Sequence, residues 1–306
     1  MKKVLVATVK PFHPLAVKGI KEICEKSNLK FSLLEKYGDK SELLNAVTDA
    51  DALIIRSDKI TEEVLDAAKN LKIVVRAGAG YDNVNCAKAA ENDVVVMNTP
   101  GQNSNAVAEL AFGMMLYLAR GKFNGKAGIE LKDKKIGIHA YGNVGKNVAR
   151  IAKGLGMKVY AFDPFVSKEN IEADGVKVMD KVEDLYSQCD YISLHIPLLD
   201  ATRNFVNEKY FSMMKEGACL VNTARKEVVD EEALVKIFAE RKDLRYISDI
   251  APDCRKELEE KYPERTLFTP KKMGAQTMEA NVNAGLAAIN QIVKYFENGD
   301  VTFKVN

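Results

Sequence analysis

Histidine, cysteine and tryptophan are scarce in this sequence. Its 306 residues include three histidines, five cysteines and no tryptophan. The cysteines lie far apart and form no C-x-x-C pair, so the sequence shows neither the ligand spacing of a zinc site nor the pattern of a disulfide framework. No metal is therefore expected, and free thiols fit a reducing cytoplasm.

Long apolar runs and blocks of like charge are also missing. Lys and Arg number 45 and Asp and Glu 43, which leaves a formal net charge of +2 and no basic stretch typical of a nucleic-acid-binding face. The apolar start of the chain is broken at Lys10 and Pro11, too early for a signal peptide. The most apolar segment, 106–119, is shorter than the roughly 20 residues that cross a membrane. We therefore expect a globular protein that binds a small molecule, and neither nucleic acid nor a membrane.

Short β-branched runs alternate with helical patterns over the first 98 residues. The runs predict strands and the stretches between them predict helices, which is typical of a doubly wound α/β domain with a parallel sheet. The expected strands are 4–9, 31–34, 52–55, 73–75 and 94–97, and the expected helices are 15–26, 40–47, 62–69 and 85–92.

Residues 135–163, KIGIHAYGNVGKNVARIAKGLGMKVYAFD, predict one βαβ unit. The expected order is a strand at 136–139, a turn at 140–145, a helix at 146–155 and a strand at 158–162. Gly142 lets the backbone approach a pyrophosphate closely, and Gly145 lets the helix pack on the strand. The free N–H groups at the start of the helix favour phosphate. This unit predicts a dinucleotide-binding site.

Asp163 follows the turn by roughly 20 residues, where a carboxylate accepts hydrogen bonds from the adenosine ribose and repels a 2′-phosphate. NAD is therefore the expected cofactor, in preference to NADP. One position departs from the usual glycine fingerprint. Its first glycine is Ala140 here, so the pattern A-x-G-x-x-G requires a first turn position that accepts a Cβ.

The alternation of strands and helices continues to the end of the chain. The expected strands are 191–195, 219–222, 246–250 and 267–269, and the expected helices are 106–119, 183–187, 207–213, 231–240 and 278–298. The last helix is long enough to return to the first domain. We therefore expect two doubly wound parallel-sheet domains with a cleft between them. These are a flavodoxin-like substrate domain of residues 1–98 and 280–306, and a Rossmann NAD-binding domain of residues 99–279.

Two arginines follow strands of the first domain directly. Arg56 ends IIRS, and Arg76 begins RAGAGYDNV. Open parallel sheets bind ligands at the carboxyl ends of their strands, and Gly78 and Gly80 suit a turn that presents N–H groups to an anion. This arrangement favours an acidic substrate, although each arginine taken alone fits an ordinary surface residue or a structural ion pair.

Five motifs together resemble the D-isomer-specific 2-hydroxyacid dehydrogenase family, and most closely its members that act on 3-phosphoglycerate. The motifs are RAGAGYDNV, VVVMNTPGQNSNAVAELAFGMML, GNVGKNVARIAKGLGMKVYAFDP, VNTARKEVVDEEAL and GAQTMEAN. The resemblance implies NAD-dependent oxidation of 3-phosphoglycerate to 3-phosphohydroxypyruvate in serine synthesis, by a cytoplasmic homodimer. It implies a glyoxylate or hydroxypyruvate reductase as the rival enzyme, and an NAD-sensing binding module without catalysis as a third possibility.

The resemblance also implies roles for individual residues. Arg225 would hold the substrate carboxylate and carbonyl. The cofactor would be bound by Gly142, Asn143, Val144, Gly145, Asp163, His195, Thr202, Thr223, Ala224 and Asp249, with Asp249 at the nicotinamide end. The substrate would be bound by Arg56, Arg76, Gly78, Ala79, Gly80 and Asn103.

Two positions depart from the family pattern at the chemistry itself. The glutamate that the family has five residues after Asp249 is Cys254, with Asp253 one residue earlier. The acid/base histidine is replaced in TPKKMGAQT by Lys272, with Lys271 as the second candidate. We expect Lys272 to move the hydroxyl proton and Asp253 to orient its amine.

The chain also departs from other family members in the length of two segments. The link from Arg120 to Ile136 is short and has no tryptophan, so the subunit arm is expected to differ from that of other members. The chain ends at Asn306, without the serine-sensing domain of longer members, so no inhibition by serine is expected.

Overall fold

The computed structural model describes all 306 residues, which divide into two compact units. Unit 1 comprises Met1–Asn103 and Gln276–Asn306, and unit 2 comprises Ser104–Ala275. The divisions fall after residues 103 and 275, whereas the sequence placed them after 98 and 279. The loop that starts at Thr99 stays with unit 1 because its N–H donates to the Gly78 carbonyl at 3.0 Å. None of the helices has the length and apolar character to span a membrane.

Unit 1 is built on a parallel five-stranded sheet in the order β2-β1-β3-β4-β5, the flavodoxin-like order. The strands are β1 (Lys3–Thr8), β2 (Lys30–Glu35), β3 (Ala52–Ile55), β4 (Ile73–Arg76) and β5 (Val95–Asn98). The helices are α1 (Pro14–Lys26), α2 (Lys40–Val47), α3 (Glu62–Ala67), α4 (Cys86–Glu91) and α12 (Met278–Asn298).

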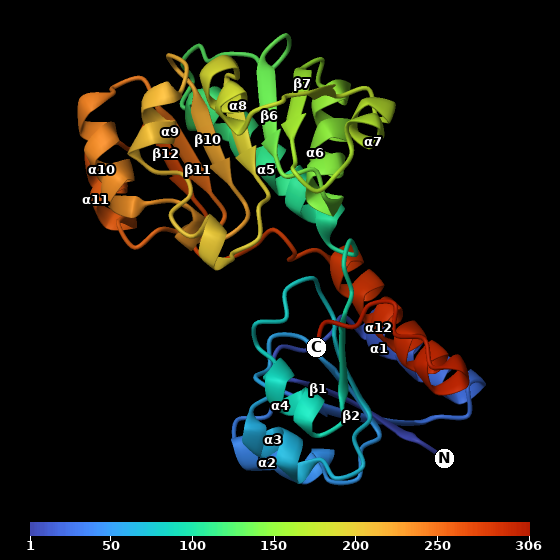
Figure 1. The fold of residues 1–306 in the computed structure, drawn as a ribbon. Helices are drawn as coiled ribbons and strands as arrows, with labels where there is room; N and C mark the ends of the chain where they lie inside the picture. Colours follow the sequence, from blue (N-terminus) through green and yellow to red (C-terminus); the bar gives the residue numbers. More distant parts are fainter. The chain divides into compact units, whose positions relative to one another are not determined.

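Successive residues of β1 point into two separate hydrophobic cores. Val4 and Val6 face α1 and α12, whereas Leu5 and Ala7 face the core shared with α2, α3 and α4. Burial on both faces explains the continuous apolar runs of this parallel sheet. Figure 1 shows α1 and α12 side by side on one face of the sheet. The helix that returns from the end of the chain thus completes the core of unit 1.

Unit 2 is built on a parallel seven-stranded sheet in the order β12-β11-β10-β9-β6-β7-β8. Its strands are β6 (Lys135–His139), β7 (Lys158–Phe162), β8 (Lys177–Val178), β9 (Tyr191–Leu194), β10 (Cys219–Asn222), β11 (Arg245–Ser248) and β12 (Thr266–Phe268). Its α-helices are α5 (Ser104–Ala119), α6 (Asn143–Gly154), α7 (Lys168–Ala173), α8 (Val182–Gln188), α9 (Glu208–Met213), α10 (Glu231–Glu240) and α11 (Arg255–Lys261). Three 3-10 helices are η1 (Gly121–Phe123), η2 (Asp200–Thr202) and η3 (Lys226–Val228). The strand order reverses between β6 and β9, which is the switch point of the Rossmann fold.

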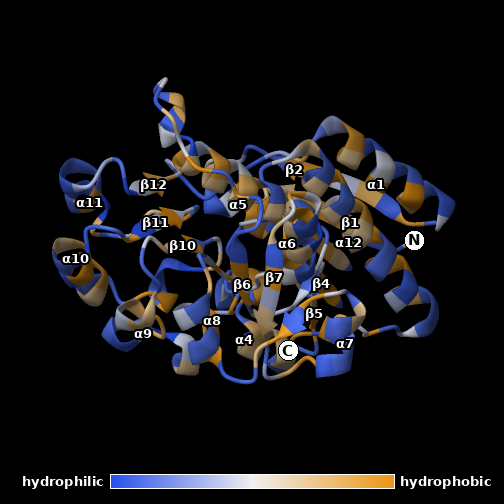
Figure 2. Cartoon of the chain, turned by 90° about the horizontal axis from the view of Figure 1, so that it is seen from above, coloured by the Kyte–Doolittle hydropathy of each residue, from blue (hydrophilic) through white to orange (hydrophobic).

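Three short elements of unit 2 were not expected from the sequence. They are α7, β8 and α11, and each carries too few apolar residues to show a period. α11, RKELEEK, buries only Leu258 and is drawn almost entirely in the hydrophilic colour of Figure 2. A second difference concerns α6, which begins at Asn143 rather than at Lys146. The glycine-rich sequence predicted a loop over residues 140–145, but residues 143–145 belong to the first turn of the helix.

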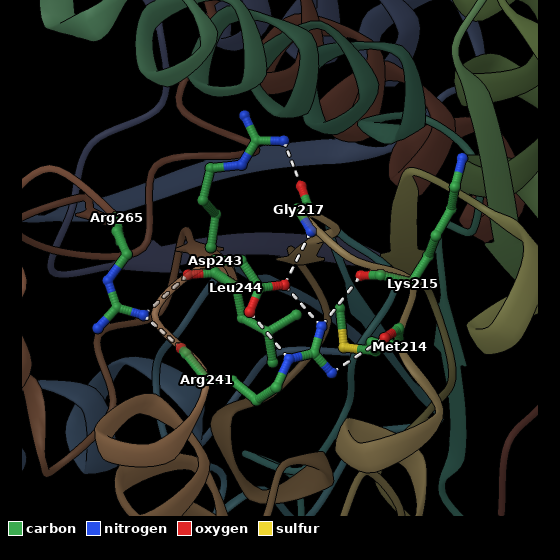
Figure 3. A network of polar contacts seen from close by, with 8 residues as sticks. Met214, Lys215, Gly217, Arg241, Asp243, Leu244 and Arg265 are labelled. Atoms are coloured by element: carbon green, nitrogen blue, oxygen red, sulfur yellow. Dashed lines mark hydrogen bonds and ion pairs between the residues drawn. The ribbon is translucent and has the colours of Figure 1, made fainter.

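A polar network fastens the amino ends of β10 and β11 (Figure 3). The Arg241 guanidinium donates to both carboxylate oxygens of Asp243, at 2.9 and 2.6 Å, and to the Met214 carbonyl at 3.1 Å. The N–H of Gly217 donates to Asp243 at 2.8 Å. The Arg265 guanidinium donates to the carbonyls of Arg241 and Leu244, at 2.7 and 3.3 Å. The Arg241 guanidinium holds the pKa of the Asp243 carboxyl well below its usual range. This network lies at the edge of the sheet where the strands begin, opposite the functional row described next.

Candidate functional site in the nucleotide-binding unit and the arginine loop

The residues that follow six strands of unit 2 form one row at the carboxyl edge of the sheet. The parallel register aligns Phe162, His139, Leu194, Asn222, Ser248 and Phe268 across adjacent strands. The residues that follow these six in the chain form the row itself. In the same order they are Asp163, Ala140, His195, Thr223, Asp249 and Thr269. Four of these six residues were predicted from the sequence to meet the cofactor. Parallel pairing in a common register therefore brings them together.

The glycine turn after β6 has the features of a phosphate cradle. Gly142 is the N-cap of α6, and a Cβ added to it would meet no protein atom within 4 Å. Protein packing does not demand this glycine, so the open space in front of it fits a pyrophosphate. A Cβ on Gly145 would lie 2.4 Å from the Ala140 carbonyl oxygen, so here the helix packs too closely on the strand for a side chain. Asn143, Val144 and Gly145 begin the helix, where N–H groups lack partners within the helix.

Ala140 occupies a backbone conformation that glycine adopts more readily. Its φ is +80°, in the left-handed region that a Cβ disfavours. The expected turn position thus accepts a Cβ only under strain. The neighbouring Tyr141 is fully buried, and its hydroxyl donates to Asp174 at 3.0 Å. The buried tyrosine fixes the turn in spite of the strain at Ala140.

The Asp163 carboxylate is positioned by two backbone N–H groups. Its Oδ2 accepts from Tyr141 at 2.6 Å and its Oδ1 from Phe165 at 2.8 Å. Each oxygen keeps one further acceptor site, so the carboxylate can still accept from two ribose hydroxyls. The geometry at this residue fits the adenosine end of NAD.

Two histidines lie beside this turn, the buried His139 and the half-buried His195. His139 is 4% exposed, and its Nδ1 lies 3.2 Å from the Tyr186 hydroxyl. His195 follows β9, with its Nε2 2.9 Å from the Ser193 hydroxyl and its Nδ1 3.4 Å from that of Thr223. Burial lowers the pKa of His139 to about 4 and that of His195 to about 3. Both imidazoles are therefore neutral at physiological pH.

The Thr202 hydroxyl closes its own loop. It accepts from the Leu199 N–H at 2.8 Å and lies 2.6 Å from the Pro197 carbonyl, to which it donates. This bonding gives the loop after His195 a fixed form. The side chain is held by the protein itself at a position that the family resemblance assigns to the cofactor.

Arg225 lies in a short loop whose backbone is hydrogen-bonded by the Asn222 side chain. Asn222 is fully buried; its amide donates to the Arg225 carbonyl at 2.8 Å and accepts from the Ala224 N–H at 2.9 Å. The Arg225 Nη1 donates to the Ala224 carbonyl at 2.9 Å. A guanidinium has five N–H donors, so most of them can serve a ligand. The sequence predicted Arg225 but missed Asn222, although the NTAR motif contains it.

The loop that carries Lys272 is attached to Asp249. This aspartate is 1% exposed, and its carboxylate accepts from the N–H groups of Met273 and Gly274, at 2.7 and 2.8 Å. The Thr269 hydroxyl lies 3.0 Å from Oδ1. Lys271 and Lys272 are both exposed. The expected cofactor residue Asp249 thus holds the backbone next to the expected catalytic lysine.

Asp253 forms an ion pair with Lys226, whereas the sequence analysis expected it to orient the Lys272 amine. Its carboxylate is 81% exposed and accepts from the Lys226 Nζ at 2.6 and 2.7 Å. Glu231, at the start of α10, accepts from the N–H groups of Asp253 and Cys254, at 3.0 and 2.9 Å. Burial and the Glu231 carboxylate raise the pKa of the Cys254 thiol to about 12. These contacts fasten the Arg225 loop to the segment after β11.

In unit 1, the two predicted arginines contact each other. The Arg76 Nε donates to the Arg56 carbonyl at 3.0 Å, and the Arg56 Nη1 donates to the carbonyls of Lys10 and Pro11, at 3.0 and 2.9 Å. The Arg56 guanidinium also lies over the Phe12 ring, 5.4 Å from its centroid, and burial lowers its pKa. Arg56 therefore has a structural role, whatever else it binds.

The backbone conformation of Gly78 favours glycine, and the Arg76 guanidinium occupies the space beside it. Its φ is +147°, and a Cβ there would lie 1.5 Å from the Arg76 Nη1. The N–H groups of Gly78, Ala79 and Gly80 donate no hydrogen bond within the protein. Three such donors beside a guanidinium form a concavity for an anion. Asn103 stands at the end of unit 1, directly before α5.

Replacing Ala140 with glycine is predicted to stabilise the protein. Relief of the left-handed strain exceeds the added entropy of the unfolded chain, so the free energy of unfolding should rise by about 0.5–1 kcal/mol. Urea unfolding measures the change. Ala149→Gly, in the helical backbone of α6, is the matched control and should destabilise by about 1 kcal/mol. Equal destabilisation by both variants would contradict the assignment of strain.

The buried His139 predicts a loss of stability in mild acid. Because His139 has a folded-state pKa near 4, the unfolded chain binds its proton at a higher pH than the folded chain does. Stability is therefore retained above about pH 6.5 and falls by up to about 1.4 kcal/mol per pH unit for this group below it. His139→Asn should flatten the dependence of urea stability on pH between about 7 and 5. An unchanged slope would show that His139 does not titrate as described.

Comparison with protein families and curated proteins gives consistent matches. The family model described as D-isomer specific 2-hydroxyacid dehydrogenase, NAD binding domain, matches residues 112–270. The chain is 35% identical to hydroxypyruvate reductase of Thermotoga maritima, over 92% of this chain and 95% of that protein. It is 34% identical to D-3-phosphoglycerate dehydrogenase of Methanocaldococcus jannaschii, over 96% of this chain and 57% of that protein. The chain spans 48–59% of the length of the curated D-3-phosphoglycerate dehydrogenases compared with it.

A solved structure is similar over the whole chain. It is the NAD+-bound 3-phosphoglycerate dehydrogenase of Entamoeba histolytica, with 46% identity and a TM-score of 0.90, covering 100% of this chain and 98% of that one. The matches and the two parallel sheets confirm the family resemblance, the fold class and the NAD cofactor expected from the sequence. The chain belongs to the D-isomer-specific 2-hydroxyacid dehydrogenases, a family of NAD-dependent oxidoreductases.

Proposed function

We propose that the protein oxidises 3-phosphoglycerate to 3-phosphohydroxypyruvate with NAD, the reaction that feeds serine synthesis. The observation that carries the proposal is the anion-binding loop of unit 1. Three free N–H groups from Gly78 to Gly80 lie beside the Arg76 guanidinium. The likeness to the Entamoeba histolytica enzyme supports a phosphorylated substrate.

Arg225 is proposed to bind the substrate carboxylate and the C2 oxygen. A guanidinium stays charged at every physiological pH and holds a planar carboxylate through two parallel hydrogen bonds. Asn222 holds the backbone of this loop through the Ala224 N–H and the Arg225 carbonyl, and the Arg225 Nη1 donates to the Ala224 carbonyl. Bound NAD supplies the acceptor for the hydride that leaves C2. The guanidinium stabilises the negative charge that develops on the C2 oxygen.

Lys272 is proposed to take the proton from the C2 hydroxyl. An amine does so only in its neutral form, and the free pKa of lysine is about 10.4. The neutral fraction therefore grows as pH rises, so oxidation should have an optimum above neutral pH. The protonated amine is the competent acid for the reverse reaction. The exposed side chain sits on a loop whose backbone is held by Asp249.

Lys272→Ala is predicted to lower kcat by roughly 10²–10⁴-fold, the usual contribution of a general acid or base. It should also remove the rise of the oxidation rate above neutral pH. Steady-state rates from about pH 6 to 10 measure both effects, with Lys271→Ala as the matched control. Near-normal turnover of Lys272→Ala with an unchanged pH profile would contradict the role. If Lys271→Ala shows the loss instead, the role belongs to Lys271.

A reductase of glyoxylate or hydroxypyruvate is the second candidate, and one observation favours it. The Arg56 Nη1 is already bonded to the carbonyls of Lys10 and Pro11, so this arginine has fewer donors for a phosphate. The 35% identity to a hydroxypyruvate reductase, over nearly its whole length, points the same way. The two candidates differ in whether Arg56 recognises a phosphate.

Arg56→Ala is predicted to raise KM for 3-phosphohydroxypyruvate at least about 10-fold more than KM for hydroxypyruvate, because only the former loses a charged hydrogen bond to phosphate. Parallel steady-state kinetics with NADH measure the ratio. Lys69→Ala removes an exposed cation from the opposite edge of the same sheet and should leave both constants unchanged. An equal rise of KM for both acids would favour the reductase.

We also propose a homodimer in the cytoplasm. Leu116, Phe123 and Ile129 expose 38%, 69% and 43% of their surface on the C-terminal part of α5 and the segment after it. Exposed apolar side chains in one region favour a subunit interface. The five free cysteines fit a reducing compartment.

A further inference from the structure

Asp249 joins three segments of unit 2 in the interior of the protein. It follows β11, and its own N–H donates to the Asn222 carbonyl at 3.0 Å. Its carboxylate accepts from Met273 at 2.7 Å and from Gly274 at 2.8 Å. The same Asn222 holds the Arg225 backbone. A continuous series of hydrogen bonds thus runs from the loop of the arginine to the loop of the lysine.

The packing around the carboxylate leaves little freedom. Asp249 is 1% exposed, and the Thr269 hydroxyl lies 3.0 Å from its Oδ1. A Cβ on Gly274 would lie 2.9 Å from Oδ2 and 3.1 Å from the Val107 Cγ2. Only glycine therefore allows the backbone at 274 to approach the carboxylate this closely. A buried carboxylate must be satisfied by donors, and here two of the donors are the N–H groups that directly follow Lys272.

We propose that Asp249 is a positioning residue for Lys272, and that it fixes the lysine loop relative to the Arg225 loop. The inference rests on the proposed role of Lys272. It differs from the role that the family resemblance assigns to Asp249, contact with the nicotinamide. The two roles predict different coupling between Asp249 and Lys272.

Asp249→Asn tests the proposal. The side chain keeps its shape, but its NH₂ group would face a backbone N–H that the carboxylate now accepts, so donor meets donor. The expected result is a loss of kcat of about 10-fold or more, with the Kd of NADH within about threefold of the wild type. A positioning residue acts through its partner, so Asp249→Asn should cause no further loss in a Lys272→Ala background.

The double variant separates the outcomes. A kcat within about threefold of Lys272→Ala alone supports the proposal. Losses that multiply, together with a raised Kd of NADH, would assign Asp249 to the nicotinamide and overturn it. Losses that multiply with an unchanged Kd would also overturn it. If Lys272→Ala alone has near-normal activity, the proposed role of Lys272 fails first, and the two failures remain distinct.

Two further variants control for folding. Thr269→Val removes the hydroxyl near Oδ1 and leaves the carboxylate charge. We expect a smaller loss of kcat than in Asp249→Asn, and no further loss when Thr269→Val is combined with Lys272→Ala. A further loss in that double variant would contradict the proposal. Asp243→Asn disrupts a half-buried carboxylate at the other edge of the sheet, in the network of Figure 3. It should lower the melting temperature and leave kcat per folded molecule unchanged. If Asp249→Asn does not fold, the cycle is measured with Thr269→Val.

Discussion

The common register of the parallel strands in unit 2 is the constraint on which its site depends. Because β6, β7, β9, β10, β11 and β12 run in one direction and pair in step, the residue after each strand falls in a single row. Asp163, His195, Thr223 and Asp249 are brought to one edge in this way. A shift of one residue between two strands would turn every side chain of one strand to the other face. The two hydrophobic cores that cover the sheet keep that register.

Hydrogen bonds from buried polar groups then refine the loops that follow the row. Asn222 shapes the Arg225 loop, and Asp249 shapes the Lys272 loop. In unit 1, Gly78 provides the space that the Arg76 guanidinium fills. Loops whose backbones are held by buried partners cost less to order when a ligand binds. Within each unit, the loops of the candidate site are therefore largely ordered before any ligand arrives.

Much of this architecture follows from the sequence because its signals are local. β3, β7 and β10 have the limits that their apolar runs predicted, and α2, α10 and α12 have the limits that their periodicity predicted. The motif GNVG and Asp163 indicated a nucleotide site because each glycine has a separate steric reason. What the sequence did not show depends on pairs of residues far apart in the chain. The Lys226–Asp253 pair and the attachment of residues 273 and 274 to Asp249 arise only when strand ends meet.

Local signals also misled at two places. Glycines at 142 and 145 predicted a turn, but α6 starts at Asn143, and Gly145 within its first turn packs closely against the Ala140 carbonyl. Ala140 has a left-handed φ, which its own sequence preference does not predict and which the folded turn requires. Helix propensity alone cannot anticipate either feature, because tertiary packing decides both.

The central claim is that the protein is a dehydrogenase of a phosphorylated D-2-hydroxy acid. The measurement that tests it most directly is the rate of NADH oxidation by the purified protein with 3-phosphohydroxypyruvate, hydroxypyruvate and glyoxylate in parallel. The account predicts a kcat/KM for the phosphorylated acid well above that for the other two. Equal or higher values for the unphosphorylated acids would contradict it and identify a reductase.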